Sequence, residues 1–356
     1  MKNENLHRLQ AAMPEGLDAL LITSERHQYY LTGFDFSDGY VALTREKAYV
    51  FTDFRYIEAA KACIDTDAFA IHMNNSLSFV RDTLVAEGIK VVGFEDHDVT
   101  VAALRRYESV FGEDVTLAPM GNILGDLRVC KTEEEIALIK KAQSIGDAAF
   151  EHILGFITPE RTELEVALEL ETHMKRLGAS GTSFSTICIS GAATSLPHGE
   201  PQNRRLEKGF LTMDFGCIYR GYCSDMTRTV AIGEVTNEMR RVYDTVLAAQ
   251  TAVLEQIAWH ADCGEMDKIA RDIIDGAGYA GAFGHSLGHG VGLYIHESPR
   301  LSQRSFGEIL ENGHVVTVEP GIYLEGKFGV RIEDMVIIHG NKAENITHSR
   351  KDLIVL

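Results

Sequence analysis

The chain has few basic residues for its size. Its 356 residues include 34 Lys and Arg against 52 Asp and Glu, a formal net charge of −18 at pH 7. Nucleic acids and anionic membranes attract proteins through positive charge, so we expect neither as a partner. The acidic excess fits ordinary solubility; alternatively, part of it is concentrated at a site that binds cations.

Long apolar runs and paired cysteines are also missing. No apolar run reaches the roughly 18–20 residues that a membrane span requires, and residues 1–5 are polar, so we expect no secretory signal. The six cysteines form no CxxC pair and no zinc-ribbon spacing. Free thiols are typical of a reducing compartment, so we predict a cytoplasmic protein.

Length and pattern predict two α/β (α+β) domains. Residues 1–122 alternate strand and helix patterns, which predicts a small α/β domain. Thr132 and Glu135 form a capping box, which predicts that a helix opens a second domain over residues 131–345. The elements expected from pattern are strands at residues 17–22, 40–43, 48–51, 91–94, 185–190, 209–218, 227–232, 314–319 and 329–334, and helices at 101–111, 162–177, 236 to about 260, and 265–275.

The second domain contains short sequence echoes. Gly178-x-x-Gly181 recurs as Gly278-x-x-Gly281, and His198-x-x-Pro201 recurs as His296-x-x-Pro299. Both repeats fall near the same offset, and helices precede strands twice along the domain. We therefore predict two similar half-domains related by a pseudo-twofold axis.

Two aspartates belong to a predicted hairpin over residues 211–229. A turn centred on Tyr219 and Arg220 would set Asp214 opposite Asp225. Like charges on facing strand positions repel, and a cation between them removes that cost. Two solvated surface aspartates would give the same local pattern.

Three histidines follow in a glycine-rich segment. His285, His289 and His296 are flanked by glycines at 284, 288, 290 and 292, which disfavour a helix and predict an extended backbone. Neutral imidazole is a common metal ligand, and glycine permits a close approach of substrate to backbone.

Two glutamates and an arginine belong to the last predicted strands. Glu319 ends one strand at a Pro-Gly turn, and Arg331 and Glu333 share one face of the next. Burial of Glu333 would require a cationic partner. Four carboxylates and one imidazole suit two divalent ions such as Mn²⁺, Co²⁺ or Zn²⁺; of these we expect Mn²⁺, with the other two as alternatives. Such a pair, about 3.5–4 Å apart, can hold a bridging hydroxide and stabilise an acyl-transfer transition state.

In this order and context, the motifs resemble the "pita-bread" metallopeptidases. Residues 197–199, 288–290, 296–297, 318–321 and 331–334 resemble more narrowly the prolidase and aminopeptidase P group, and residues 1–122 resemble its creatinase/prolidase-like N-terminal domain. The resemblance implies an enzyme that hydrolyses the bond between an N-terminal residue and a following proline in a peptide. It implies an Xaa-Pro aminopeptidase, with the Xaa-Pro dipeptidase (prolidase) as the alternative, and a homodimer.

The resemblance also implies roles for nine residues. Asp214 and His289 would each bind mainly one metal, and Asp225 and Glu333 would bridge the two. Glu319 would bind metal and accept a proton from water. The remaining catalytic or substrate-binding residues would be His198, His285, His296 and Arg331.

Two other interpretations are open to test. Gly284-His-Ser286-Leu-Gly288 matches the nucleophile motif of serine hydrolases, which requires a strand before it and a helix after it. A member of the fold that has lost catalysis and only binds partners should have lost metal ligands, and this chain retains the full set.

Overall fold

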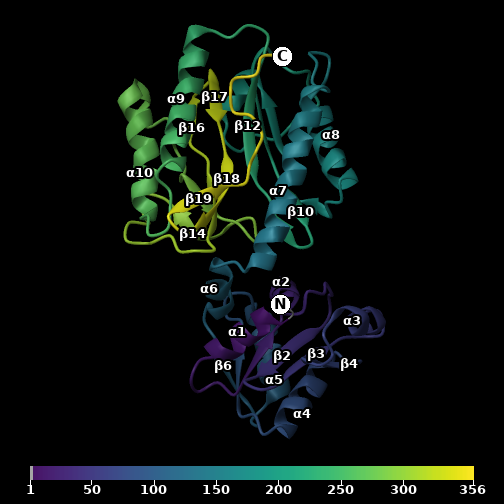
Figure 1. The fold of residues 1–356 in the computed structure, drawn as a ribbon. Helices are drawn as coiled ribbons and strands as arrows, with labels where there is room; N and C mark the ends of the chain where they lie inside the picture. Colours follow the sequence, from purple (N-terminus) through teal and green to yellow (C-terminus); the bar gives the residue numbers. More distant parts are fainter. Residues whose placement is uncertain (1–2) are drawn as a thin grey trace. The chain divides into compact units, whose positions relative to one another are not determined.

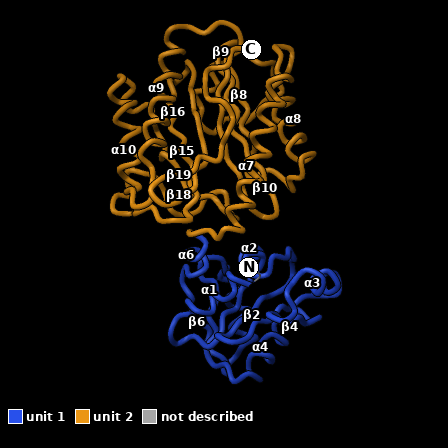
Figure 2. The backbone as a smooth tube through the Cα atoms, viewed as in Figure 1, with its two compact units in different colours: residues 1–128 blue, residues 129–356 orange. Residues whose placement is uncertain are grey.

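The protein divides into two compact units, residues 1–128 (unit 1) and 129–356 (unit 2) (Figure 2). The structure is a computed structural model that describes residues 3–356. Within that range, no helix is both long and apolar enough to span a membrane. The six cysteines are free thiols, as predicted.

Unit 1 is a six-stranded sheet with strand order β4-β3-β2-β1-β5-β6. The pairings β1–β2 and β2–β3 are antiparallel, whereas β3–β4, β1–β5 and β5–β6 are parallel. The alternating strand and helix patterns therefore form the predicted small α/β unit. Its elements are α1 (Glu4–Ala12), β1 (Ala19–Ile22), α2 (Glu25–Thr32), β2 (Tyr40–Thr44), β3 (Ala48–Phe51), α3 (Ile57–Cys63), β4 (Phe69–His72), α4 (Leu77–Ala86), β5 (Val91–Phe94), α5 (Val101–Phe111), β6 (Thr116–Pro119) and α6 (Ile123–Val129).

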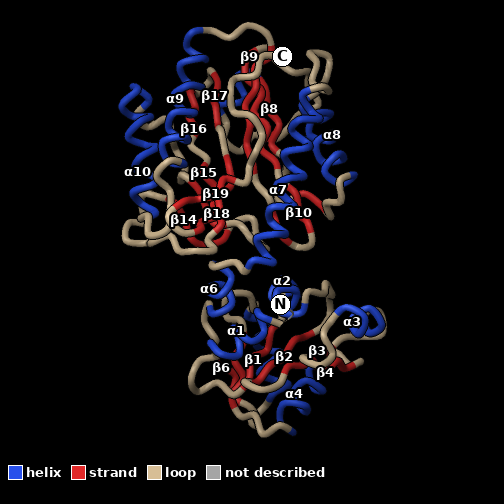
Figure 3. The backbone as a smooth tube through the Cα atoms, viewed as in Figure 1, coloured by secondary structure: helices blue, strands red, loops and turns tan. Residues whose placement is uncertain are grey.

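Unit 2 contains two helix pairs and several small sheets. In Figure 3 its strands lie between the α7–α8 pair and the α9–α10 pair. The helices are α7 (Glu133–Leu154), α8 (Glu163–Arg176), α9 (Asn237–Leu254) and α10 (Cys263–Ile274), with the short 3-10 helix η1 (Gly191–Ser195) and the short π-helix η2 (Asp275–Tyr279). The strands are β7 (Gly181–Thr182), β8 (Ile187–Ser190), β9 (Gly209–Phe215), β10 (Cys217–Tyr219), β11 (Tyr222–Cys223), β12 (Met226–Ile232), β13 (Gly288–Gly290), β14 (Glu297–Leu301), β15 (Val315–Val318), β16 (Gly321–Leu324), β17 (Phe328–Arg331), β18 (Asp334–His339) and β19 (Lys342–Asn345).

The predicted duplication is visible in the packing of unit 2. In Figure 1 the α7–α8 pair and the α9–α10 pair lie on opposite sides of the strands of unit 2. One hydrophobic core joins α7 and α8 to the sheet β12-β9-β8, and a second joins α9 and α10 to β15 and β18. Gly178 and Gly278 occupy matching places just after the second helix of each pair, with φ of 103° and 92°. Only glycine adopts such angles readily, which explains why both halves have glycine at this position.

Side-chain caps start the helices where the sequence predicts. Thr132 and Glu135 form the expected capping box on α7, and Thr162 and Glu165 form a second box on α8. Each box satisfies amide groups that the first helical turn leaves without partners. The helix after Thr236 ends at Leu254, earlier than the predicted residue 260.

The predicted hairpin register is wrong by two residues. The turn falls at Arg220 and Gly221, since Tyr219 pairs with Tyr222, and Asp214 consequently pairs with Thr227 rather than Asp225. Both turn residues have positive φ, 45° and 81°, as the two-residue turns favoured in hairpins require. Arginine is unusual at such a position, so the sequence concealed the true turn.

The predicted strand over residues 329–334 is two strands. β17 ends at Arg331 and pairs with β16, whereas β18 begins at Asp334 and pairs with β15. Ile332 and Glu333 connect the two sheets. The break allows Glu333 to reach a partner on β12, as described next.

Candidate functional site

The nine residues singled out from the sequence line one cavity in unit 2, with a volume of about 910 Å³. Both halves of the duplicated fold contribute: β9 and the residue just before β12 come from the first, and β13, β17 and the residue just after β15 come from the second. The residues are Asp214, Asp225, His285, His289, Glu319, Arg331 and Glu333, together with His198 and His296.

His289 presents one ring nitrogen to two carboxylates. Its Nδ1 lies 3.0 Å from the Gly290 carbonyl oxygen, which can only accept, so Nδ1 carries the proton. The unprotonated Nε2 lies 3.3 Å from Glu319 Oε1 and 3.6 Å from Asp225 Oδ2. This is the arrangement by which a carbonyl orients a metal-binding imidazole. Burial lowers the pKa of His289 to about 3, so the ring is neutral near neutral pH.

Asp225 and Glu333 are almost fully enclosed. Together with His289 they form a buried group whose ligand atoms lie within 4.8 Å of one another. Burial first, and then repulsion from neighbouring carboxylates, raises the pKa of both carboxyl groups well above the ordinary range. A cation among them would remove this cost of burying like charges.

Thr227 connects Glu333 to Arg331. The Thr227 hydroxyl donates to Glu333 Oε2 over 2.6 Å and accepts from Arg331 Nε over 3.0 Å. Arg331 in turn donates to Asp214 Oδ2 over 2.6 Å. Because Oδ2 is occupied, the other oxygen of Asp214 is available; Oδ1 is buried and has no hydrogen-bond partner. Buried polar atoms normally have a partner, so a buried carboxylate oxygen that accepts no hydrogen bond is well suited to bind a metal ion.

Glu319 begins the turn that follows β15. Its Oε1 accepts a hydrogen bond from the Thr317 hydroxyl over 3.1 Å, and its Oε2 lies 3.9 Å from His285 Nδ1. Burial raises the pKa of Glu319 to about 8. A carboxyl group with such a pKa can exchange a proton with water near neutral pH.

The donor set fits two divalent ions. Four carboxylates and one neutral imidazole converge from β9, from β13 and from the segments that connect β11 to β12, β15 to β16 and β17 to β18. An oxygen-rich set with one nitrogen suits hard-to-borderline ions. The unpartnered Asp214 Oδ1 and the open Nε2 of His289 supply the structural support for that assignment.

Tyr323, which the sequence analysis missed, ties His285 to Arg331. Its hydroxyl accepts from Arg331 Nη1 over 2.7 Å and lies 2.8 Å from His285 Nε2. The Nδ1 of His285 lies 2.9 Å from the Ser286 carbonyl oxygen and therefore donates, so Nε2 accepts from Tyr323. Burial raises the pKa of Tyr323 to about 12, which keeps the hydroxyl protonated, and burial lowers the pKa of His285 to about 4.

An ion pair on α10 fixes the segment that carries His285. Arg271 donates to the carbonyl oxygens of Phe283 and His285 over 2.6 and 3.0 Å. Asp267, fully buried, accepts from Arg271 Nε over 2.9 Å and from the Leu287 amide over 3.0 Å. The sequence shows the i, i+4 spacing of Asp267 and Arg271, but it does not show that the pair binds the backbone of residues 283–287.

The remaining wall of the cavity is mixed. His198 and His296, the matched histidines of the two halves, line it together with Arg300 on β14. The His296 ring packs against the His289 ring with centroids 4.3 Å apart. Phe184, Ile187 and Ile295 add apolar surface. The cavity can therefore accept a small peptide with an apolar residue and a charged end.

The serine-hydrolase geometry is not present at Ser286. An irregular segment precedes this serine, and β13 follows it at Gly288 instead of a helix. A nucleophile elbow needs a strand, a sharp turn and then a helix. The local backbone therefore does not support that alternative.

Comparison with known proteins agrees with the fold. Residues 137–340 match the model of metallopeptidase family M24, and residues 6–130 match that of the creatinase/prolidase N-terminal domain. The chain is 43% identical to the peptidase YqhT of Bacillus subtilis (strain 168) over the whole of both chains.

Solved structures show the same two-part architecture. An Xaa-Pro dipeptidase from Bacillus anthracis superposes with a TM-score of 0.94 at 41% identity, covering 99% of each chain. An X-Pro aminopeptidase from Thermotoga maritima MSB8 gives 0.93 at 35% identity, covering 98% of this chain and 100% of that one. The chain belongs to metallopeptidase family M24, with a creatinase/prolidase N-terminal domain preceding a pita-bread catalytic domain.

Proposed function

We propose that the protein is a peptidase that cleaves the bond between an N-terminal residue and a following proline. The observation that carries this proposal is the convergence of four carboxylates and an open imidazole nitrogen in one peptide-sized cavity. The two solved relatives described above are named as an Xaa-Pro dipeptidase and an X-Pro aminopeptidase. An Xaa-Pro amide has no N–H, so a site dedicated to it is chemically reasonable.

The proposed ligands are Asp214, Asp225, His289, Glu319 and Glu333, with Mn²⁺ as the expected metal and Co²⁺ or Zn²⁺ as alternatives. When bound, the two ions would supply an activated water and neutralise charge that develops on the peptide carbonyl. Glu319 would take the proton from that water, since its carboxylate lies beside His289 among the proposed ligands and can accept a proton. His198, His285 and His296 would hold the peptide.

Arg331 would hold the neighbouring side chains of the site in their orientations. Its contacts with Asp214, Thr227 and Tyr323 hold three side chains around one guanidinium group. A planar guanidinium fixes partner directions better than an ammonium group does. Arg331 would therefore orient Asp214 and, through Tyr323, keep His285 in one tautomer.

Arg300 favours dipeptides over longer peptides. It lines the cavity, and its cation can pair with the free carboxylate that a dipeptide carries directly after proline. This supports the dipeptidase (prolidase) alternative, whereas the sequence analysis placed the aminopeptidase first. The two named relatives divide between these activities.

Three further assignments complete the proposal. The free thiols are consistent with a cytoplasmic protein. Residues 1–122 and 131–345 are the proposed functional domains. A homodimer is the expected assembly, and a sedimentation mass equal to one chain would contradict it.

A length and residue series tests the substrate assignment. The Mn²⁺-loaded protein should hydrolyse Xaa-Pro dipeptides faster than Xaa-Pro-Xaa tripeptides and should leave Xaa-Ala dipeptides almost intact. Arg300→Gln should raise KM for dipeptides at least about tenfold, the loss expected for an unpaired carboxylate, and change tripeptide cleavage little. Equal loss for both lengths would contradict the role of Arg300, and preference for Xaa-Ala would contradict the proline assignment.

A further inference from the structure

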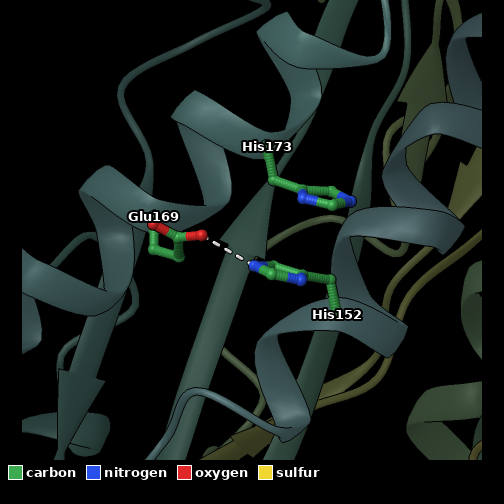
Figure 4. Close-up of side chains that lie close together, drawn as sticks. All are labelled: His152, Glu169 and His173. Atoms are coloured by element: carbon green, nitrogen blue, oxygen red, sulfur yellow. Dashed lines mark hydrogen bonds and ion pairs between the residues drawn. The ribbon is translucent and has the colours of Figure 1, made fainter.

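Three metal-binding side chains lie together on the outer helices of the catalytic unit, away from the cavity. His152 belongs to the last turn of α7, and Glu169 and His173 lie one turn apart on α8 (Figure 4). None of the three lines the cavity described above. The cluster is therefore separate from the proposed dinuclear centre.

The three side chains are already held close together. His152 Nε2 lies 2.7 Å from Glu169 Oε1, and the rings of His152 and His173 stack with centroids 3.8 Å apart and planes 8° apart. One ligand atom from each lies within 4.8 Å of the other two. Glu169 Oε1 also lies 3.7 Å from Arg176 Nη1, at the edge of the cluster.

His173 lacks an obvious structural role for its ring nitrogens. Within residues 3–356, neither nitrogen makes a hydrogen bond or an ion pair, although the residue is only partly exposed. Burial first, and then the neighbouring His152, lowers the pKa of His173 below its usual value. The ring is therefore neutral at neutral pH and has a lone pair available.

We propose that His152, Glu169 and His173 bind one transition-metal ion of the nitrogen-preferring kind, namely Zn²⁺, Cu²⁺ or Ni²⁺. Two imidazoles and one carboxylate form the set that such ions prefer, whereas the oxygen-rich centre in the cavity also suits Mn²⁺. Binding would turn the stacked rings about χ2, a soft torsion, and release to solvent the proton that His152 Nε2 shares with Glu169. Water would complete the coordination.

The bound ion would join α7 to α8. The i, i+4 pair Glu169 and His173 anchors it on one helix, and His152 reaches it from the other. An ion that binds only the folded state stabilises that state by mass action. The protein should therefore gain thermal stability from Zn²⁺ beyond what filling the cavity provides.

Zinc stoichiometry separates this site from the cavity. Metal-stripped wild-type protein, His152→Gln/His173→Gln and the control His348→Gln would be titrated with Zn²⁺ by calorimetry. His348 is exposed and lies outside the cluster, so its replacement makes the same chemical change without altering the three proposed ligands. The wild type and the control should bind one more ion per chain than the double variant, and equal stoichiometry in all three would overturn the proposal.

A spectroscopic measurement checks the ligands directly. In Asp225→Asn/Glu333→Gln protein, which weakens the cavity centre, one equivalent of Cu²⁺ should give an electron paramagnetic resonance spectrum with coupling to two imidazole nitrogens. Adding His173→Gln should reduce this coupling to at most one nitrogen. The same two-nitrogen spectrum after His173→Gln would overturn the assignment even if the stoichiometry differed.

Discussion

Arg331 binds only one of the two carboxylate oxygens of Asp214. The Arg331 Nη2 atom donates to Asp214 Oδ2 over 2.6 Å, while Asp214 Oδ1 is buried without a hydrogen-bond partner. The pair thus sets the direction of one proposed metal ligand across 117 residues of sequence. The arrangement couples the orientation of Asp214 to the guanidinium plane of Arg331.

Arg331→Lys should therefore weaken metal binding although it retains the charge. The ammonium group cannot contact Asp214, Thr227 and Tyr323 at once, so we expect a loss of about 10–100-fold in metal affinity, typical for partners of metal ligands. Metal affinity would be measured by competition with a chelator, with circular dichroism as the check on folding. A folded Arg331→Lys protein with wild-type metal affinity would show that Arg331 does not orient the site.

Thr227→Val should have a similar but smaller effect. It removes the hydroxyl that donates to Glu333 Oε2 at nearly constant side-chain volume, so we expect about a tenfold loss of metal affinity. Thr227→Ser retains the hydroxyl and serves as the matched control. The account requires the serine variant to bind metal at least severalfold more tightly than the valine variant; equal affinities would remove Thr227 from it.

Loss of Arg271 alone should destabilise the protein more than replacement of both Asp267 and Arg271. Arg271→Met leaves Asp267 fully buried without its charge partner, which typically costs about 3–5 kcal/mol. It also frees the carbonyl oxygens of Phe283 and His285. Asp267→Asn/Arg271→Met should recover part of the lost melting temperature, because the buried charge is gone.

Thermal melting of both variants with bound metal checks this expectation. The single variant should also show reduced kcat/KM, since His285 loses its backbone support. If the double variant melts no higher than Arg271→Met, the unpaired charge of Asp267 is not the cause of the destabilisation.

Metal binding should strengthen as pH rises from about 5 to 8. The pKa of Glu319 in the metal-free fold is about 8, above its ordinary value, so the folded protein holds a proton there that metal must displace. The stability that this raised pKa contributes is present at low pH and is lost as pH rises through about 8. His289, with a pKa of about 3, stays neutral throughout this window.

The difference in melting temperature between metal-loaded and metal-stripped protein should consequently grow over that pH range. Glu319→Gln removes one of the three carboxyl groups whose pKa is raised, so the pH dependence should become shallower without vanishing. A wild-type difference that stays constant from pH 5 to 8 would contradict the protonated state assigned to the metal-free site.

The sequence predicted most of the architecture because its signals are local. Capping boxes mark the starts of α7 and α8, and glycines flank His289 on β13. The nine residues selected from motifs do lie around one cavity, although their roles stay proposals.

The failures arose where structure depends on backbone angles or distant partners. Arg220 adopts a positive φ, which is unusual for arginine and was not predicted from the sequence. The predicted pairing partner of Asp214 was therefore wrong by two positions. Tyr323 was missed because its importance comes from packing against His285 and Arg331 rather than from a motif. His152 meets His173 only after α7 and α8 pack together.

The central claim is most directly tested by hydrolysis of an Xaa-Pro dipeptide by metal-stripped protein before and after addition of Mn²⁺, Co²⁺ or Zn²⁺. The account predicts almost no activity without metal, restoration by at least one of the ions, and a loss of at least about 10³-fold in Asp225→Asn, the scale expected when a catalytic metal site is broken. Activity that survives complete removal of metal, or folded protein that cleaves no Xaa-Pro bond with any of these ions, would contradict it.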